Sequence, residues 1–416
     1  MPPSLELPSI FIDLQIPLLY LNNIFALAIG PQHQGLRVAV SLPVHILLIA
    51  QSLYRQWRGP WGDHYALNCV VCSCTFIYVD WVLLKSPDKE AWRKIQYGGS
   101  GSKAKGKGVG GVKGGVKEQG KGKNAASVPQ TFWGRVWWGL RLSTTARYVG
   151  WSCEVKNVPK EVDAGYSRIR FIARKTLRAV FFYFLKDFIY AYAAASPHGT
   201  WRDIAHLRPA VSNADASFWS RFSYAWLHIV LAYAALELWS TGYGIISVAT
   251  GLANPRDCPS AFGDLKRLVS VRNAWSVVWH QNCRRVCSAP GIYVARDVLR
   301  LPRGSFASKY LQLFIGFGIS ALVHGGASML VHRSFEDDAA FGFFIGQAVI
   351  IMVEDHVIDF GKRLGLKDSL FWRLVGFCWT VFAIGASCER YTSKMIGNEI
   401  WVLDRAPDWF GIGPVV

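Results

Sequence analysis

The chain has 416 residues, of which 51% are hydrophobic and 14% aromatic, and its mean hydropathy is +0.19. Soluble domains average about 25% charged residues, whereas this chain has 18%, gathered in blocks between long uncharged stretches. These values argue against an ordinary soluble protein and indicate that lipid solvates part of the chain. The net charge of +18 is compatible with nucleic acid, anionic lipid or an anionic substrate as partner, so the position of the charges has to distinguish these classes.

Eight stretches are candidate membrane spans, because a spanning helix needs about 20 mostly apolar residues. They lie near residues 10–30, 36–54, 64–84, 177–196, 222–250, 311–332, 339–358 and 371–388. Polar residues interrupt the first stretch, which is the weakest. A further stretch near 132–150 mixes Trp with Arg, which predicts a helix at the membrane interface. The sequence therefore predicts an all-α polytopic membrane protein with about eight transmembrane helices and additional interfacial helices.

A low-complexity segment divides the chain. Residues 98–123 hold eleven glycines and seven lysines against one acid, Glu118, a composition that cannot bury a core and predicts a disordered cytoplasmic loop. We place this loop at 98–128, between N-terminal transmembrane helices at 1–97 and a core at 129–416. No aromatic residue is interleaved with the lysines, so no nucleic-acid partner is expected. Attraction to anionic membrane lipid stays open as an alternative to a plain solvated insertion.

The basic blocks also predict a topology. The segments 85–176, 264–309 and 361–373 follow the third, fifth and seventh candidate spans. With two spans between neighbouring segments, all three lie on one side, which the positive-inside rule makes cytoplasmic. The N-terminus is then predicted to be lumenal.

Nine cysteines are present, and Cys69, Cys72 and Cys74 form a CxxC-like group inside a candidate span. Such a pair can bind zinc or carry out redox chemistry. No second pair and no histidine follow at metal-ligand spacing, so we expect small packing residues in a helix and no metal site.

Two histidines are the strongest candidates for chemistry. His324 lies in the apolar run LQLFIGFGISALVHGG among small residues, and a polar group inside a span is expensive and often functional. The small residues favour either close helix packing or room for a substrate. His280 lies in SVRNAWSVVWHQNCRR, which mixes aromatic and basic residues. From the residues alone, a structural histidine at either position remains an alternative.

Four motifs in order resemble one family. SVRNAWSVVWHQNCRR resembles the first signature of the wax synthase domain, in the membrane-bound O-acyltransferase superfamily, and ISALVHGG resembles its second, a Ser-Gly-x-x-His inside a membrane helix. RYVGWSCEVKNVP and FGFFIGQAVIIMVED resemble stretches of the fungal members. The residues that match are Gly150, Trp151, Val155, Lys156, Asn157, Pro159, Ser270, Arg272, Trp275, Trp279, His280, Gln281, His324, Gln347, Glu354 and Asp355.

The resemblance implies an acyl-CoA-dependent O-acyltransferase in the endoplasmic reticulum membrane, with no bound cofactor and with acyl-CoA as co-substrate. His324 matches the histidine regarded as catalytic and is expected to be the general base. His280, with Trp279 or Gln281, is expected to stabilise the oxyanion or position the substrate. A basic cluster is expected to attract the phosphates of coenzyme A, with ordinary positive-inside residues as the alternative. Its members are Lys266, Arg267, Arg272, Arg284 and Arg285.

The resemblance to fungal members favours transfer of acetyl from acetyl-CoA to a hydrophobic terpenoid or meroterpenoid alcohol in secondary metabolism. Wax-ester synthesis from a long-chain acyl-CoA and a fatty alcohol is the alternative, and a membrane transporter is a third reading. Val271, Ala274 and Ala321 depart from the family's usual Leu, Phe and Gly, and such changes bear on the acyl tunnel or acceptor pocket. Glu354 and Asp355 are expected to pair with arginines or to cap a helix.

Overall fold

The computed structural model describes residues 14–57, 59–95, 128–163, 165–196, 216–400 and 407–414. Helices and connecting segments, with no β-strand, make up these ranges. The main helices are α2 (Gln15–Ile29), α3 (Gln34–Ala50), α4 (Trp61–Tyr78), α5 (Ser86–Lys89), α6 (Phe132–Ser143), α7 (Arg168–Ala195), α9 (Phe218–Ala249), α10 (Val271–Asn273), α11 (Arg284–Tyr293), α12 (Phe306–His332), α13 (Ala340–Arg363) and α14 (Leu370–Gly397). Except for residue 128, the glycine- and lysine-rich loop predicted at 98–128 lies outside the described residues.

Within the described ranges, six helices are long and apolar enough to cross a membrane. They are α3, α4, α9, α12, α13 and α14, where the spans of α3 and α4 include their adjoining 3₁₀ and π turns. The all-α polytopic prediction is confirmed, whereas the count of eight is not. The stretch near 10–30 forms α2, which has only 15 residues, and that near 177–196 forms the second half of α7, whose first half is basic. The predicted topology depended on the count of eight and stays a prediction.

Serine side chains start several of the long helices. The hydroxyl oxygens of Ser217, Ser305 and Ser369 accept hydrogen bonds from backbone amides three residues later, at 3.2, 3.3 and 3.4 Å. Each satisfies an amide that has no partner within the helix, which fixes the first turns of α9, α12 and α14. The polar residues at the edges of the apolar stretches therefore determine where these helices begin.

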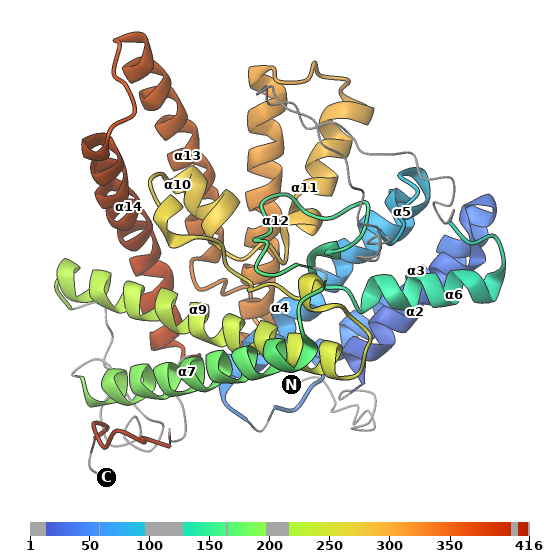
Figure 1. The fold of residues 1–416 in the computed structure, drawn as a ribbon, viewed down its shortest axis with the longest axis horizontal. Helices are drawn as coiled ribbons and strands as arrows, with labels where there is room; N and C mark the ends of the chain where they lie inside the picture. The colour runs from blue at the N-terminus through green and yellow to red at the C-terminus, as the bar shows by residue number, and fades with distance from the viewer. Residues whose placement is uncertain are drawn as a thin grey trace, which may run out of the picture.

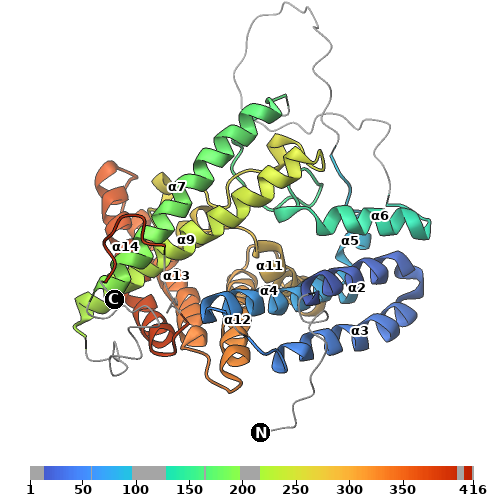
Figure 2. The ribbon, with the colours of Figure 1, turned by 90° about the horizontal axis from the view of Figure 1, so that it is seen from below.

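Helix α12 has neighbours from both the N-terminal and the C-terminal parts of the chain. Figure 1 shows α12, α13 and α14 standing upright, with α7 and α9 crossing below them, and Figure 2 shows α7 and α9 side by side along their length. Helix α12 packs against α4, α11 and α13, and α14 packs against α9. Gly325 on α12 permits part of this approach, because a Cβ there would meet the Phe341 ring at 2.6 Å. A residue on α12 is thus in reach of elements from both ends of the chain.

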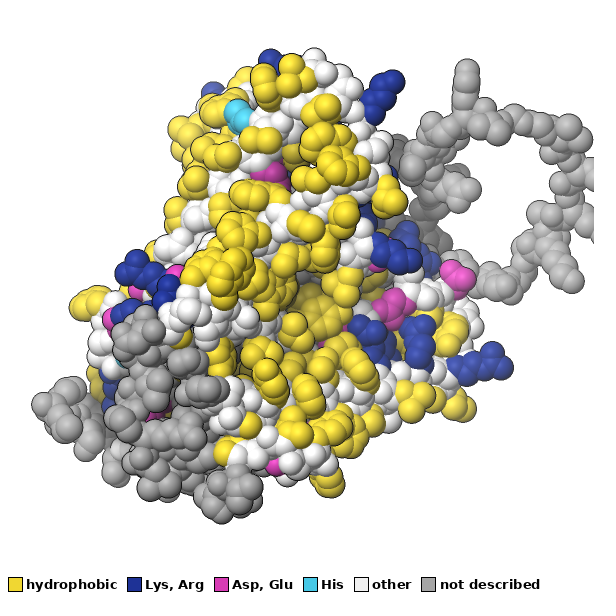
Figure 3. Space-filling model, turned by 90° about the vertical axis from the view of Figure 1, so that its left-hand side faces the viewer, with side chains coloured by type: hydrophobic (Ala, Val, Ile, Leu, Met, Phe, Trp, Pro, Cys, Tyr) yellow, Lys and Arg dark blue, Asp and Glu magenta, His cyan; other side chains and the backbone are white. Residues whose placement is uncertain are grey.

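The outer face of α13 and α14 is strongly apolar. Figure 3 shows a side of the molecule on which hydrophobic side chains are spread over much of the described surface, with Lys and Arg mainly toward its edges. The exposed large side chains of α13 and α14 include Val357, Phe360, Leu370, Phe371 and Leu374. Such a continuous apolar face is expected of helices that contact lipid chains. The predicted lipid environment therefore agrees with the surface of the fold.

The predicted interfacial stretch near 132–150 forms α6 and a tight turn. Helix α6 exposes Trp133 and Trp137, and it buries Arg135 and Trp138. The Arg135 guanidinium reaches inward to the carboxylate of Asp88 and to the Leu27 carbonyl. This short helix is therefore tied to the N-terminal helices by buried polar contacts, and it presents Trp133 and Trp137 outward, as an interfacial helix does.

Candidate active site

His324 lies on α12 where three other helices meet. Its Nδ1 is 2.7 Å from the Tyr65 hydroxyl on α4, and its ring stacks on Phe344 of α13, with centroids 4.7 Å apart and planes 16° from parallel. The Tyr65 hydroxyl in turn hydrogen-bonds the Tyr391 hydroxyl on α14. The imidazole is thus held at one nitrogen and on one face. It keeps some accessible surface, as a side chain that meets a substrate must.

A thiol is the second neighbour of the same imidazole nitrogen. The sulfur of Cys69, one helical turn after Tyr65, lies 3.7 Å from His324 Nδ1. All nine cysteines of the chain are free thiols, and the described residues contain no group of His, Cys, Asp or Glu side chains arranged to hold a metal ion. Cys69 therefore contributes a packing or weak hydrogen-bonding contact beside the histidine.

His280 lies in the turn that follows a π-helical segment, Ala274–Val278. Its ring meets Trp279 at 5.5 Å and the Phe262 ring edge-on at 5.8 Å. Burial, together with the nearby charges that His324 and Arg147 can carry, lowers the pKa of His280 from 6.5 to about 3. The side chain is therefore neutral at physiological pH. Its Nδ1 is buried and has no hydrogen-bond partner among the described residues, which leaves this atom available to a ligand.

Gln281 and Trp279 hold the shape of this turn. The Gln281 amide donates to the carbonyls of Trp275 and Trp279, at 3.1 and 2.6 Å, and its oxygen accepts a hydrogen bond from Arg284. The Trp279 ring packs edge-on against Phe262 at 5.0 Å. The polar atoms of Gln281 are thus engaged with the protein, whereas the aromatic face of Trp279 lies next to His280.

Three of the four arginines in the cluster predicted to attract coenzyme A have protein partners. Arg272 forms two hydrogen bonds with Asp355, and Arg284 donates to the Ser276 carbonyl. Arg285 pairs with Asp80 and Glu90 and lies over the Trp92 ring, 4.7 Å from its centroid. Carboxylates therefore compensate the charges of Arg272 and Arg285, whereas the printed partners of Arg284 are neutral oxygens. The exposed cations of the predicted cluster are Lys266 and Arg267.

Three of the four motifs meet around the π-helical segment. The Asn157 amide donates to the Ser276 carbonyl at 2.9 Å, and the Trp275 indole donates to Gln347 at 3.0 Å. Glu354 accepts hydrogen bonds from the amides of Val271 and Arg272, at 2.8 and 3.0 Å, and so caps the start of α10. Asp355 pairs with Arg272. Glu354 and Asp355 were expected to cap a helix or to pair with arginines, and both kinds of contact are present.

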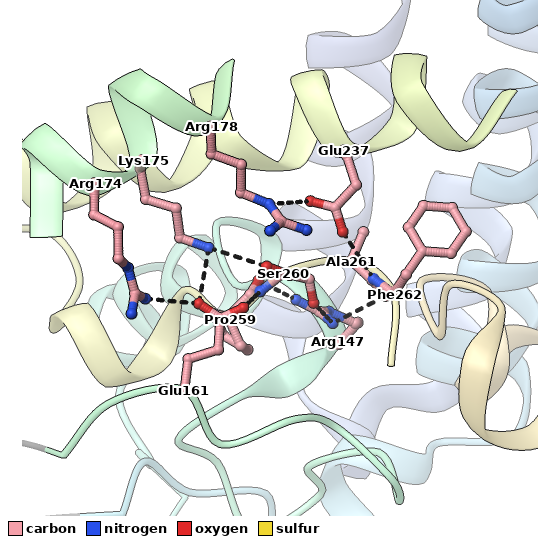
Figure 4. Close-up of polar contacts among 10 residues, drawn as sticks. All are labelled: Arg147, Glu161, Arg174, Lys175, Arg178, Glu237, Pro259, Ser260, Ala261 and Phe262. Carbon is pink, nitrogen blue, oxygen red and sulfur yellow. Dashed lines mark hydrogen bonds and ion pairs between the residues drawn. The ribbon is translucent and has the colours of Figure 1, made fainter. Parts of the chain in front are cut away.

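A supporting loop, residues 258–263, lies beside His280 and is fixed by buried charges (Figure 4). The Arg147 guanidinium donates to the carbonyls of Pro259 and Ser260, both at 2.7 Å, and to that of Ala261 at 3.4 Å. Glu237 accepts the amide hydrogen of Phe262 at 3.1 Å and pairs with Arg178.

On the other edge of the loop, Glu161 accepts the amide hydrogen of Ser260 at 2.7 Å and pairs with Arg174 and Lys175. Burial would raise the pKa of Glu161, but Lys175 and the Ser260 amide keep it below its usual value. The loop then joins the π-helical segment, since Gly263 donates to the Val278 carbonyl at 2.9 Å. A Cβ at Gly263 would lie 2.1 Å from the carbonyl oxygen of Val277 in the π-helical segment. This close approach of the two backbones therefore requires glycine.

Several residues of this site were not predicted from the sequence. Tyr65 and Tyr391 lie far from His324 in the chain, and only the fold joins them. His228 is different, because it lies in an apolar span and the rule that selected His324 applies to it equally. Its ring lies edge-on to Tyr391, with centroids 6.3 Å apart. Glu237, a charged residue inside a spanning helix, carried the same signal.

Comparisons with known proteins agree with the resemblance. Residues 258–346 match the membrane bound O-acyl transferase family. The chain is 49% identical over 405 residues to acetyltransferase sirH of Leptosphaeria maculans, covering 97% of this chain and 96% of the relative. It is 31% identical to acetyltransferase ple2 of Rhodocybe pseudopiperita, covering 67% and 70% of the two chains, and 32% identical to acetyltransferase pyr8 of Aspergillus fumigatus, covering 58% and 59%. No solved structure matches significantly.

Proposed function

We propose that this chain, which belongs to the membrane bound O-acyl transferase family and transfers acyl groups, moves acetyl from acetyl-CoA to a hydroxyl of a hydrophobic terpenoid or meroterpenoid alcohol. The donor follows from the relatives, whose names call them acetyltransferases. The acceptor class follows from the resemblance of its motifs to fungal secondary-metabolite enzymes. The endoplasmic reticulum membrane is the proposed location of this multi-pass protein.

The arrangement of His324 and His280 supports the reaction best. His324 is fixed through Nδ1 and the face of its ring, and His280 is held in a turn with a buried Nδ1 that has no hydrogen-bond partner among the described residues. Both residues fall within the segment that matches the family. A fixed imidazole and a second, neutral imidazole provide one group to accept a proton and one to donate a hydrogen bond.

The proposed reaction needs no covalent enzyme intermediate. The acceptor O–H transfers its proton to His324 as the oxygen attacks the acetyl carbonyl carbon, and a C–O bond forms. Negative charge on the carbonyl oxygen is stabilised by the N–H of neutral His280. The C–S bond then breaks, and the departing thiolate takes the proton from the His324 imidazolium. The products are the acetyl ester and free coenzyme A, and the imidazole is neutral again.

Coenzyme A is a co-substrate that carries phosphate charges. Arg272, Arg284 and Arg285 already pair within the protein, so we propose that they shape the turn around His280. The exposed side chains of Lys266 and Arg267 are the better candidates to attract the phosphates. This revises the sequence-based assignment of the arginines without moving the proposed binding region.

Long-chain acyl transfer is the alternative function. A wax-ester synthase needs an apolar channel for a long acyl chain, whereas an acetyltransferase does not. The names of the relatives favour the short acyl group. Comparing acetyl-CoA with palmitoyl-CoA on the same preparation separates the two functions, and preferred use of palmitoyl-CoA would reject the acetyl proposal.

The test uses microsomes that express the full chain, supplied with labelled acetyl-CoA and a panel of terpenoid and fatty alcohols. Wild type is compared with His324→Ala and with His45→Ala, a matched control for loss of a buried histidine in another spanning helix. We expect labelled ester from wild type and from the control, and none from His324→Ala at equal expression. Equal activity of His324→Ala and wild type would remove His324 from the mechanism.

A further inference from the structure

The hydrogen bonds at His324 raise a question about its tautomer. A neutral imidazole carries a proton on one nitrogen and a lone pair on the other. Nδ1 is occupied by the Tyr65 hydroxyl at 2.7 Å, so the two tautomers differ in which partner donates. If Tyr65 donates to Nδ1, then Nε2 carries the hydrogen and cannot accept a proton from an alcohol. If Nδ1 donates to Tyr65, then Nε2 presents its lone pair.

The Tyr391 hydroxyl can accept from Tyr65 or donate to it, and the second case uses it as the acceptor. When the Tyr65 oxygen accepts from Nδ1, its own hydrogen needs an acceptor, and the Tyr391 hydroxyl is within hydrogen-bond distance. A continuous chain then runs from Nδ1–H to the Tyr65 oxygen and from the Tyr65 O–H to the Tyr391 oxygen. Hydrogen bonds arranged in one direction polarise and strengthen each other.

We propose that Tyr65 and Tyr391 are positioning residues that hold His324 in the tautomer whose Nε2 accepts the proton of the alcohol. This inference rests on the proposed role of His324 as the base. Both tyrosines lie outside the segment 258–346 that matches the family, and they come from helices α4 and α14. Neither hydroxyl has to touch the substrate, since each acts through His324.

The same chain stabilises the charged form of His324 during the reaction. After the imidazole accepts a proton at Nε2, its Nδ1–H donates from a cation, and such a hydrogen bond is about twice as strong as a neutral one. Stacking on Phe344 fixes the plane of the ring, and the Tyr65 contact fixes its rotation in that plane. Loss of the Tyr65 hydroxyl should therefore reduce the rate of the chemical step more than substrate binding.

The test measures acetyl transfer from labelled acetyl-CoA to the panel alcohol that wild type esterifies fastest. For Tyr65→Phe we expect kcat to fall by about 10- to 100-fold, the usual contribution of a hydrogen bond to a charged group, with KM for acetyl-CoA within about twofold of wild type. Tyr391→Phe should lose less, since it acts through Tyr65. The double variant should match Tyr65→Phe, because without the Tyr65 hydroxyl the Tyr391 hydroxyl is disconnected.

Tyr78→Phe is the matched control. Tyr78 lies on the same helix, is buried, stacks on His45 and hydrogen-bonds the Ser41 hydroxyl at 2.8 Å, so it reports what loss of a buried tyrosine hydroxyl costs away from the site. We expect near wild-type kcat for this variant. Each variant is solubilised in detergent and checked for a monodisperse elution peak, as a control for folding. If Tyr65→Phe does not give such a peak, the inference is tested with the kcat and KM of Tyr391→Phe instead.

The outcomes separate this inference from the function on which it rests. If His324→Ala keeps activity, the proposed base fails and the inference fails with it. If His324→Ala is inactive but Tyr65→Phe and Tyr391→Phe both retain wild-type kcat, the inference alone is overturned. Losses that multiply in the double variant would show that the two hydroxyls act independently, and would reject the directional chain.

Discussion

The supporting loop beside His280 gives a quantitative prediction for Arg147→Lys. The guanidinium makes two short hydrogen bonds at 2.7 Å and a weaker one at 3.4 Å, all to backbone carbonyls of the loop. A lysine keeps the positive charge near Glu161 and Glu237, but its single ammonium lacks the planar fork that reaches adjacent carbonyls. The φ of +56° at this residue strains lysine and arginine equally, so the comparison isolates the side chain.

At least one charge-assisted hydrogen bond is lost, which costs about 1.5–3 kcal/mol when the abandoned carbonyl stays buried. For a chain of this size that corresponds to a fall of ~2–3 °C in apparent melting temperature. Acetyl transfer should fall as well, since the loop places the Phe262 ring against His280.

The assay follows thermal unfolding of detergent-solubilised protein and acetyl transfer at 25 °C. Arg141→Lys is the control, because Arg141 donates one bond, at 3.0 Å, to the Leu252 carbonyl near the surface and a lysine can replace it. We expect the control to melt and react like wild type. An Arg147→Lys variant with wild-type melting and wild-type activity would refute the idea that the guanidinium holds the loop.

Three further predictions follow from the same geometry. Cys69→Ser should retain at least a third of wild-type acetyl transfer, since the proposed reaction uses no thiol nucleophile; complete loss in a well-expressed variant would point to an acyl-enzyme instead. Glu354→Gln should lower the apparent melting temperature, because it removes the charge from a cap that is worth about 1 kcal/mol; an unchanged melting curve would contradict that role. For pH dependence, His280 has a folded pKa of about 3, below its unfolded value of about 6.5.

Between those values the unfolded state binds the extra proton, so His280 lowers stability as pH falls below about 6.5. Between pH 7 and pH 5, the apparent melting temperature of His280→Gln should therefore fall less than that of wild type. Equal falls in the two proteins would argue against a buried neutral histidine.

The sequence predicted the helices best where apolar length and edge residues agree. The stretch near 311–332 appears as α12, and Ser305 marks its start through a cap that the residue type already suggests. The stretch near 177–196 was predicted as a separate span. It instead continues from a basic segment as α7, because cationic residues in a helix can pair with neighbours such as Glu161 and Glu237.

The site was predictable only in part. His324 and His280 carry signals in their local sequence, as a histidine in an apolar run and a histidine in a family-like motif. The partners of His324 do not, because Tyr65 lies 259 residues away in the chain and an aromatic residue in a span is ordinary. The arginines of the basic cluster were chosen for charge. In the fold Arg272 pairs with Asp355, and Arg285 pairs with Asp80 and Glu90. No spacing rule indicates the proximity of these acids.

The contact of Tyr65, His324 and Tyr391 has a consequence for biosynthesis of the protein. These side chains come from an early, a late and the last long helix, α4, α12 and α14. During translation α4 enters the membrane long before its two partners are made. The imidazole therefore gains its full set of neighbours only after α14 has been inserted and docked. A nascent chain that still lacks α14 has no Tyr391 to contact Tyr65 and should be inactive. The onset of activity is thus tied to completion of membrane insertion.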